Sequence, residues 1–240
     1  MAAAGPRAGA GAGAGTPPLG VVVLISGSGS NLQALIDARG AGFEIRAVIS
    51  NVPDAFGLKR AEAAGIQARV LDHHGYPNRA AYDADLAGLI DGFAPGLVVL
   101  AGFMRILTPG FVNHYRGRMF NIHPSLLPKF RGLHTHARAL EAGEQVHGAS
   151  VHFVTPELDG GPVVLQAEVP VLTDDDPDRL AARVLTREHL IYPRVVGWFA
   201  AGRLRLDEAD RPMLDGQVLM RPLLLDSDSA GVADQGSSRC

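Results

Sequence analysis

The sequence predicts an α/β protein built on a mostly parallel sheet with helices on both faces. Apolar runs rich in β-branched residues alternate with segments whose apolar positions follow helical spacing. The runs are nearly continuous, as in strands that are buried on both faces. Gly, Ser and Asn clusters separate the segments and mark turns. Repeated strand–helix units of this kind are typical of a parallel sheet covered on both sides.

The first half of the chain supplies these units in order. The run GVVVLI is closed by SGSGS and followed by NLQALIDA, which has helical spacing. The same alternation then repeats to LVVL at 97–100. We therefore expect strands at 20–25, 45–50, 68–71 and 97–100, and helices at 31–38, 55–65 and 79–93.

The second half has a different pattern. A short strand-like stretch, 118–120, comes first. The segments 150–154 (SVHFV) and 163–171 then read as neighbouring strands joined by a turn at ELDGGP, which favours an antiparallel pair. A long helix from about Asp178 to Ala201 completes the predicted domain.

Length and composition set the domain organisation. With 240 residues, 47% hydrophobic and 20% charged, the chain can form one sizeable domain or at most two small ones. The Ala/Gly-rich start and the polar end are low in complexity. We predict a disordered tail at 1–18, a single folded domain at 19–215, and a mostly disordered C-terminal tail at 216–240.

Charge and cysteine content exclude several classes of function. A formal net charge of −3 gives no general attraction to nucleic acid or to an anionic membrane. Cys240 is the sole cysteine, so neither an intrachain disulfide nor a thiolate metal cage can form. No apolar stretch reaches the roughly 20 residues of a membrane span. We expect a cytoplasmic protein.

The loop after the first strand carries the first candidate site. Ser26–Asn31 (SGSGSN) opens a helix, and Gly lets the backbone approach an anion beside free helix N–H groups. A dinucleotide fingerprint would need Gly where Leu32 stands, and an acid where the second strand ends in Ser50 and Asn51. The loop therefore favours a lone phosphate, although a plain tight turn also selects Gly and Ser.

Asn121 and His123 form the second candidate site. If this segment is extended, residues i and i+2 point to the same side. An Asn N–H can hold a developing oxyanion, and a His can transfer protons near neutral pH. Pro124 and Pro128 stiffen the backbone that follows. The alternative from spacing alone is a capping Asn beside a buried structural His.

Asp159 completes this set in the hypothesis. The sequence Asp159-Gly160-Gly161-Pro162 is first of all a turn. A carboxylate in such a turn can still orient a His. Ser125 lacks the glycine pattern of a nucleophile elbow, so we expect acid–base chemistry without a protein nucleophile.

The remaining histidines raise the question of a metal site. His134 and His136 are two apart, and His147 and His152 follow, but no carboxylate stands at ligand spacing and no HExxH motif occurs. We expect no metal. His73 and His74 read as a solvated pair in a loop.

Six segments, in order, resemble the phosphoribosylglycinamide formyltransferase family. They are VVLISGSGSNLQALIDA, SNVPDAFGLKRA, VVLAGFMRIL, NIHPSLLPKFRGLHTHARALEAG, HGASVHFVTPELDGGPVVLQ and REHLIYPRVV. The resemblance runs from about Gly20 to about Asp215. It implies a doubly wound, Rossmann-like formyltransferase fold with the folate site at the carboxyl ends of the strands. The resemblance also allows for a homodimer.

The resemblance implies a role for each matching residue. The catalytic set would be Asn121, His123 and Asp159. The remaining roles are glycinamide ribonucleotide binding by Gly29, Ser30, Asn31 and Glu188, and folate binding by Arg79, Met104, Arg105, Ile106, Leu107 and Asn121.

The implied reaction transfers the formyl group of the co-substrate 10-formyltetrahydrofolate to the amine of 5-phosphoribosylglycinamide in purine synthesis. Three alternatives stay open from the residues. The Gly-rich loop alone would suit a nucleotide-binding oxidoreductase. A binding module without activity would not need the acid–base set. A formyltetrahydrofolate hydrolase would use the same three residues with water in place of the amine.

Overall fold

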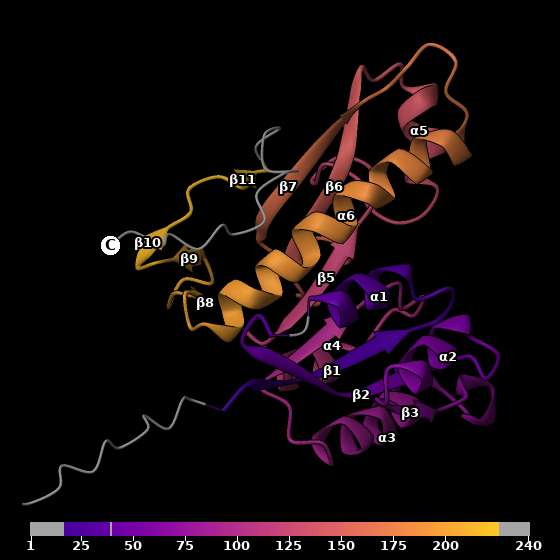
Figure 1. Ribbon diagram of the computed structural model, residues 1–240, viewed down its shortest axis with the longest axis vertical. Helices are drawn as coiled ribbons and strands as arrows, with labels where there is room; N and C mark the ends of the chain where they lie inside the picture. The colour runs from indigo at the N-terminus through magenta and orange to yellow at the C-terminus, as the bar shows by residue number, and fades with distance from the viewer. Residues whose placement is uncertain (1–16, 39, 226–240) are drawn as a thin grey trace, which may run out of the picture.

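The structure, a computed structural model, describes residues 17–38 and 40–225 (Figure 1). An eight-stranded sheet runs through it in the order β11-β7-β6-β5-β4-β1-β2-β3. The strands from β3 to β5 across this order are parallel, and β6 is antiparallel to both β5 and β7. The bounds are β1 (Leu19–Ile25), β2 (Phe43–Ser50), β3 (Gln67–Val70), β4 (Leu97–Leu100), β5 (Met119–His123), β6 (Val146–Phe153), β7 (Val163–Pro170) and β11 (Leu223–Leu224).

Helices cover both faces of this sheet, as predicted. The side chains of β1 alternate: Val21, Val23 and Ile25 join one apolar core, and Val22 and Leu24 join the other. The first core packs against α1 (Ser30–Asp37), α2 (Phe56–Ala63) and α6 (Pro177–Ala200), and the second against α3 (Arg79–Asp91) and α4 (Pro109–His114). Each fully buried Val, Leu or Ile stabilises the fold by about 1.5–3 kcal/mol.

The long helix α6 has a well-defined start. The side chain of Asp176 accepts a hydrogen bond from the backbone N–H of Arg179 at 2.8 Å, and Pro177 occupies the first turn. Seven of its side chains are buried against the sheet and α1, Glu188 among them. A short helix, α5 (Thr135–Glu141), contacts α6 and lies ahead of β6.

The end of the described chain differs from the predicted boundary at residue 215. A small antiparallel sheet forms from β8 (Leu204–Leu206), β9 (Pro212–Leu214) and β10 (Gln217–Val218). The chain then adds β11 beside β7 in the main sheet. Strands therefore continue to Leu224, because the exposed edge of β7 offers backbone partners. The predicted tails fall mainly on 1–16 and 226–240, which lie outside the described residues.

The strand order reverses between β1 and β4. From β1, the chain moves outward to β2 and β3 on one side, and later to β4 and β5 on the other. At such a point the loops that follow the two strands diverge and leave a crevice, where open α/β sheets bind their ligands. The phosphate loop follows β1, Met104–Leu107 follows β4, Asn121 and His123 lie in β5, and Asp159 follows β6.

Candidate active site

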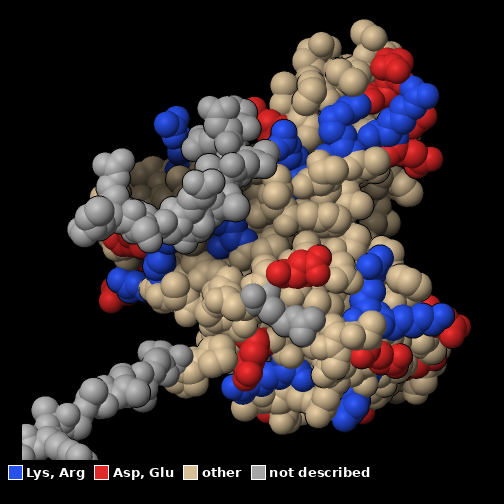
Figure 2. Space-filling view, viewed as in Figure 1, with Lys and Arg blue, Asp and Glu red and all other residues tan. Residues whose placement is uncertain are grey.

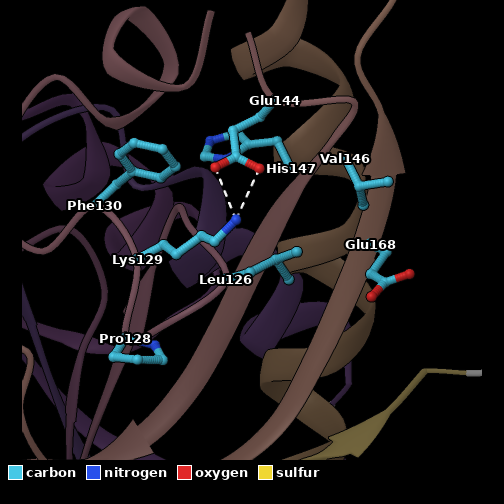
Figure 3. Close-up of a pocket in the computed structure, with 8 residues that line it drawn as sticks. All are labelled: Leu126, Pro128, Lys129, Phe130, Glu144, Val146, His147 and Glu168. Atoms are coloured by element: carbon cyan, nitrogen blue, oxygen red, sulfur yellow. Dashed lines mark hydrogen bonds and ion pairs between the residues drawn. The ribbon is translucent and has the colours of Figure 1, made fainter. Parts of the chain in front are cut away.

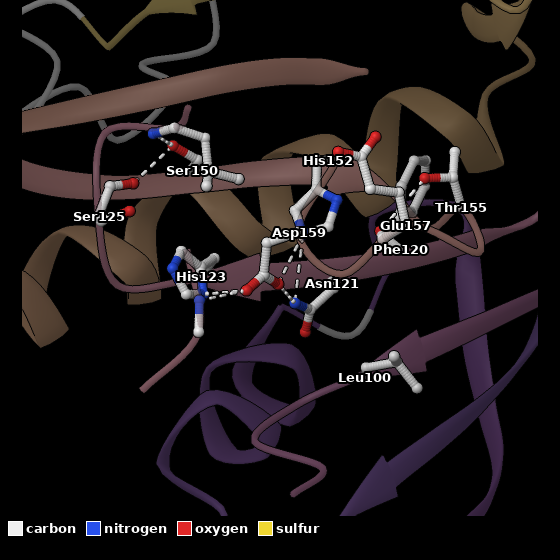
Figure 4. A network of polar contacts seen from close by, with 12 residues as sticks. Leu100, Phe120, Asn121, His123, Ser125, Ser150, His152, Thr155, Glu157 and Asp159 are labelled. Carbon is white, nitrogen blue, oxygen red and sulfur yellow. Dashed lines mark hydrogen bonds and ion pairs between the residues drawn. The ribbon is translucent and has the colours of Figure 1, made fainter. Parts of the chain in front are cut away.

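Asn121, His123 and Asp159 meet at the carboxyl end of β5. Asn121 and His123 both lie within the extended strand β5, so their side chains point to the same side (Figure 4). The Asp159 carboxylate reaches both: Oδ2 lies 3.4 Å from His123 Nδ1, and Oδ1 lies 3.5 Å from Asn121 Nδ2. The side chains of His123 and Asp159 are each 7% exposed. The structure thus brings together the three residues that the sequence singled out.

The contacts of Asp159 with His123 and Asn121 are longer than ordinary hydrogen bonds. An N···O distance near 3.5 Å is at the weak end of hydrogen bonding, and catalytic contacts often tighten only with substrate bound. The other ring nitrogen of His123, Nε2, lies 2.9 Å from the carbonyl oxygen of Phe130. A ring that is protonated at both nitrogens would donate to both oxygens. To reach a substrate oxygen through Nε2, His123 must give up the Phe130 carbonyl.

The turn predicted at Asp159 is present. Asp159 has a φ of 48°, in the left-handed region that Asp tolerates better than most residues. Its Oδ2 accepts a hydrogen bond from the backbone N–H of Gly132 at 2.9 Å. That bond joins the turn to the loop after β5 and aims the carboxylate at His123.

His152 belongs to the same cluster, although the sequence analysis placed it only among possible metal ligands. It lies directly opposite Asn121 in the antiparallel pairing of β5 and β6. Its Nδ1 lies 2.9 Å from the carbonyl of Phe153, and its Nε2 lies 3.2 Å from Asn121 Nδ2. Burial lowers the pKa of His152 to about 4, so the neutral ring donates to Phe153 and accepts from Asn121. In the sequence, Ser150 and His152 are two apart in a predicted strand, so their side chains were expected on one face, and this was the available signal that His152 could join a polar cluster.

A buried network supports the loop after β5. Ser150 Oγ donates to the carbonyl of Ser125 at 2.6 Å and accepts from the backbone N–H of Leu127 at 3.0 Å. Gln166 Nε2 donates to Ser150 Oγ and to the Leu127 carbonyl, both at 2.9 Å. Ser125 Oγ donates to the Lys129 carbonyl at 2.6 Å. Ser125 is therefore a structural residue, in agreement with its rejection as a nucleophile.

The predicted phosphate loop joins β1 to α1. Gly29 has a φ of 69°, and a Cβ there would lie 2.6 Å from the Cα of Gly57. Gln33 N–H makes the first helical hydrogen bond, to the Gly29 carbonyl at 2.9 Å. The N–H groups of Ser30, Asn31 and Leu32 precede that bond and are unpaired within the helix. This geometry suits an anion at the helix N-terminus.

Arg60 is a cation beside this loop that the sequence analysis did not single out. Its Nε donates to the carbonyl of Ser28 at 2.9 Å, and a second guanidinium nitrogen lies 3.3 Å from Gln33 Oε1. The guanidinium adds positive potential next to the helix N-terminus. Only its position in the folded structure reveals this, since α2 carries it from a separate strand–helix unit.

Glu188, which the resemblance assigns to substrate binding, lies against Asn31 of the phosphate loop. Asn31 Nδ2 donates to Glu188 Oε2 at 2.5 Å, from α1 to α6. Asn31 Oδ1 is buried without a partner among the described residues. Burial raises the pKa of Glu188, and the hydrogen bond from Asn31 opposes that shift. The pair therefore combines an available amide oxygen with a carboxyl group that is costly to ionise.

The segment Met104–Leu107 follows β4, at the edge of the sheet where the strand order reverses. Its side chains alternate: Met104 is 70% exposed and Ile106 is 55% exposed, whereas Leu107 is buried. The guanidinium of Arg105 packs over the ring of Tyr82 at 4.7 Å, and its Nε is buried without a hydrogen-bond partner among the described residues. The segment therefore offers the two exposed apolar side chains of Met104 and Ile106 to a ligand.

Arg79 is placed at the start of α3 and is exposed. It makes no hydrogen bond or ion pair with any residue that the structure describes. The structure does not bring it into the cluster around Asn121. Its side chain is free to meet a ligand that extends beyond the crevice.

Two cavities lie near these residues. One of about 380 Å³ is bordered by Asp159, Arg131 and Arg221. The other, of about 270 Å³, lies behind the loop after β5, where Lys129 bridges both carboxylate oxygens of Glu144 (Figure 3). Asp159 lines the first of these cavities, and neither cavity is lined by Asn121 or His123.

Charge and metal-ligating groups add two observations. Lys and Arg are interspersed with Asp and Glu on the face shown in Figure 2, with no large patch of one sign. Over residues 17–38 and 40–225, the three ligating side chains that come within 4.8 Å of one another are Asp72, His73 and His74, at the surface and apart from Asn121. No helix in that part of the chain has the length and hydropathy for crossing a membrane.

Comparison with known proteins identifies the family. The formyl transferase family model matches residues 19–196. Phosphoribosylglycinamide formyltransferase of Escherichia coli is 58% identical over 207 residues, covering 84% of this chain and 96% of the relative. The human trifunctional purine biosynthetic protein adenosine-3 is 46% identical, over 78% of this chain but only 19% of its own length.

Solved structures agree with this match. The phosphoribosylglycinamide formyltransferase of Coxiella burnetii has a TM-score of 0.82 and 52% identity, covering 86% of this chain and 99% of that one. A glycinamide ribonucleotide transformylase of Symbiobacterium toebii has a TM-score of 0.79 and 44% identity, covering 82% and 94%. The doubly wound fold that the sequence predicted is confirmed. The chain belongs to the formyl transferase family.

Proposed function

We propose that this protein transfers the formyl group of 10-formyltetrahydrofolate to the amine of 5-phosphoribosylglycinamide, in the de novo synthesis of purines (IMP). The observation that carries the proposal is the meeting of Asn121, His123 and Asp159 at the carboxyl end of β5. The relatives of this length that match the chain bear the name of this activity.

The two substrates would approach from the two sides of the crevice. The ribonucleotide phosphate would bind at the N–H groups of Ser30 and Asn31, with Glu188 near its amine end. The pterin ring would lie along Met104–Leu107, against the exposed Met104 and Ile106 side chains. Arg79, at the start of α3, would pair with the distant carboxylate of the folate.

The reaction would then proceed by direct attack. The amine nitrogen forms a bond to the formyl carbon, and the carbonyl oxygen becomes an oxyanion held by Asn121 and protonated His123. The bond from the formyl carbon to the folate nitrogen breaks. The proton that the amine loses reaches that nitrogen with the help of Asp159 through a bound water. No covalent enzyme intermediate forms.

The test is an absorbance assay of tetrahydrofolate formation with and without 5-phosphoribosylglycinamide. Product that depends on the ribonucleotide supports the transferase. Product at an equal rate without it indicates a hydrolase, because the same acid–base groups can activate water. No product in either case, with intact folding, would overturn the proposal. A metal-free reaction, a cytoplasmic location and a homodimer stay predictions of the same hypothesis.

A further inference from the structure

A chain of hydrogen bonds crosses the carboxyl ends of neighbouring strands in the crevice. The backbone N–H of Met104 donates to Ser26 Oγ at 2.8 Å, and Ser26 Oγ donates to Asn51 Oδ1 at 2.5 Å. Ser26 N–H also donates to the Gly102 carbonyl at 3.1 Å. Ser26 follows β1, Asn51 follows β2, and Met104 follows β4, so the chain spans the point where the strand order reverses.

The far end of this chain is fixed by His73. Asn51 is 3% exposed, and its Nδ2 lies 3.3 Å from His73 Nδ1. The same ring nitrogen lies 3.1 Å from the Asn51 backbone carbonyl. A hydroxyl has one hydrogen to donate, and Ser26 gives it to Asn51. The lone pairs of Ser26 Oγ are thereby turned toward the N–H of Met104.

Met104–Leu107, the proposed folate-binding segment, is called the folate segment below. Thr108, the residue that follows it, has a separate anchor. Asp83, on α3 and 3% exposed, accepts a hydrogen bond from the backbone N–H of Thr108 at 2.6 Å. Asp83 therefore holds the end of this segment against α3. It has no hydrogen bond to the phosphate loop among those that the structure describes. Ser26 differs, because it is itself the first residue of that loop.

We propose that Ser26 is a positioning residue that couples the ribonucleotide site to the folate site. Its hydroxyl joins the first residue of the phosphate loop to the first residue of the folate segment. An anion that orders the loop at Ser30 and Asn31 fixes the backbone at Ser26, and with it the acceptor for Met104 N–H. Each substrate then raises the affinity for the other by the same factor, as linkage requires. This inference rests on the proposed function.

The experiment measures the Kd of tetrahydrofolate by isothermal titration, with and without saturating 5-phosphoribosylglycinamide. This pair of ligands cannot react, because no formyl group is present. For the unaltered protein we expect the ribonucleotide to lower the folate Kd by at least about 5-fold, at the lower end of usual coupling factors. We call the folate Kd without the ribonucleotide, divided by the Kd with it, the coupling ratio. Ser26→Ala should bring this ratio close to one and should raise the folate Kd measured without the ribonucleotide.

Three further variants make the result specific. Ser26→Cys keeps a hydrogen-bonding group at this position but makes it larger and a weaker acceptor, so it should give an intermediate ratio even if the alanine variant folds poorly. Asp83→Ala loosens the same segment from α3, and should raise the folate Kd while the ratio stays as in the unaltered protein. Thr173→Ala removes an exposed surface hydroxyl on the loop after β7 and should change neither quantity.

The outcomes separate this inference from the proposed function. If the unaltered protein binds both ligands but shows a ratio of one, or if Ser26→Ala keeps the unaltered ratio, the coupling role is wrong and the transferase proposal stands. If Asp83→Ala abolishes the ratio as fully as Ser26→Ala does, Ser26 has no specific role. If the unaltered protein binds neither ligand, the proposed function fails and this inference fails with it.

Discussion

The Nδ1 atom of His123 lies 3.4 Å from Oδ2 of Asp159, while the Nε2 atom of the same ring lies 2.9 Å from the Phe130 carbonyl. Two oxygens thus face the two ring nitrogens across a side chain that is 7% exposed. This arrangement orients the ring and suits a proton on each nitrogen. For a ring nitrogen of His123 to donate to a substrate oxygen, that nitrogen must first leave its present partner, which is either Asp159 or the Phe130 carbonyl.

Removal of either member of this pair should abolish most of the turnover. We expect His123→Ala and Asp159→Asn each to lower kcat by about 100- to 10,000-fold, the usual contribution of a positioned acid or base. Both substrates should still bind, because neither residue forms the phosphate loop or the folate segment. Steady-state kinetics combined with equilibrium titration of each substrate will separate kcat from binding. Near-normal turnover in both variants would refute the assignment.

Gly29→Ala should damage the phosphate loop. The φ of 69° strains any residue with a Cβ, at a cost on the order of 1–3 kcal/mol, and the added atom would meet Gly57 at 2.6 Å. We expect a lower free energy of unfolding and much weaker ribonucleotide binding. Gly27→Ala is the matched control for stability, because a Cβ there meets nothing within 4 Å. Equal unfolding curves for the two variants, measured in urea, would contradict the argument.

Glu188→Gln should stabilise the free protein at neutral pH. Burial raises the pKa of Glu188 in the folded state above its ordinary value of 4.5. Its favourable contribution is therefore complete below pH 4.5 and is lost as the pH rises through the folded-state pKa. The amide cannot ionise, so the variant should gain stability relative to the unaltered protein as pH increases. Urea unfolding from pH 4.5 to 8 tests this, and parallel curves would refute it.

The same variant should also bind the ribonucleotide more weakly. Asn31 would keep a hydrogen-bond acceptor, but the carboxylate near the substrate amine would be gone. Higher stability together with weaker binding is the expected pattern for a residue kept for function. Calorimetric titration with 5-phosphoribosylglycinamide measures the second part. Unchanged affinity would place Glu188 outside the binding site.

His152 should make the protein sensitive to mild acid. Burial lowers its pKa in the folded state to about 4, from an ordinary 6.5. Its contribution to stability is present above pH 6.5 and is lost as the pH falls from there toward 4. His152→Gln should make the decline of the unfolding free energy over that interval shallower. His147, whose pKa burial also lowers to about 4, should remain as a further source of the decline, as should His136 and His189, whose pKa values burial also lowers.

Tyr192→Phe should weaken the join between α6 and the sheet. The Tyr192 hydroxyl is buried and lies 2.8 Å from the Leu100 carbonyl and 3.1 Å from the Phe120 carbonyl. Its loss leaves the carbonyl of Leu100, at the end of β4, and that of Phe120, near the start of β5, without this donor, at a cost of about 1–3 kcal/mol. Thermal unfolding monitored by circular dichroism will measure the loss. Thr186→Ala, at an exposed position on the same helix, serves as the control and should change Tm little.

Sequence reasoning placed the first-half elements well, because local signals determine them. The strand predicted at 97–100 is β4, and the long helix predicted from Asp178 to Ala201 is α6 within one residue at each end. It did not predict α4, α5 or the strands from β8 to β11. Those short elements gain their stability from packing against the sheet, and the edge of β7 is what pairs β11.

By itself, the sequence determined the α/β class and the glycine loop after β1, and it singled out Asn121 and His123, since periodicity and turn residues act over a few positions. It placed the strand only at 118–120, and the structure extends it to His123. The tertiary structure decided which distant residues meet. It set Asp159 against His123, placed His152 opposite Asn121, and put Arg60 beside the phosphate loop. It also joined Ser26 to Met104. These contacts depend on the strand order and on the antiparallel register of β5 and β6, which packing of the whole chain fixes and no local pattern records.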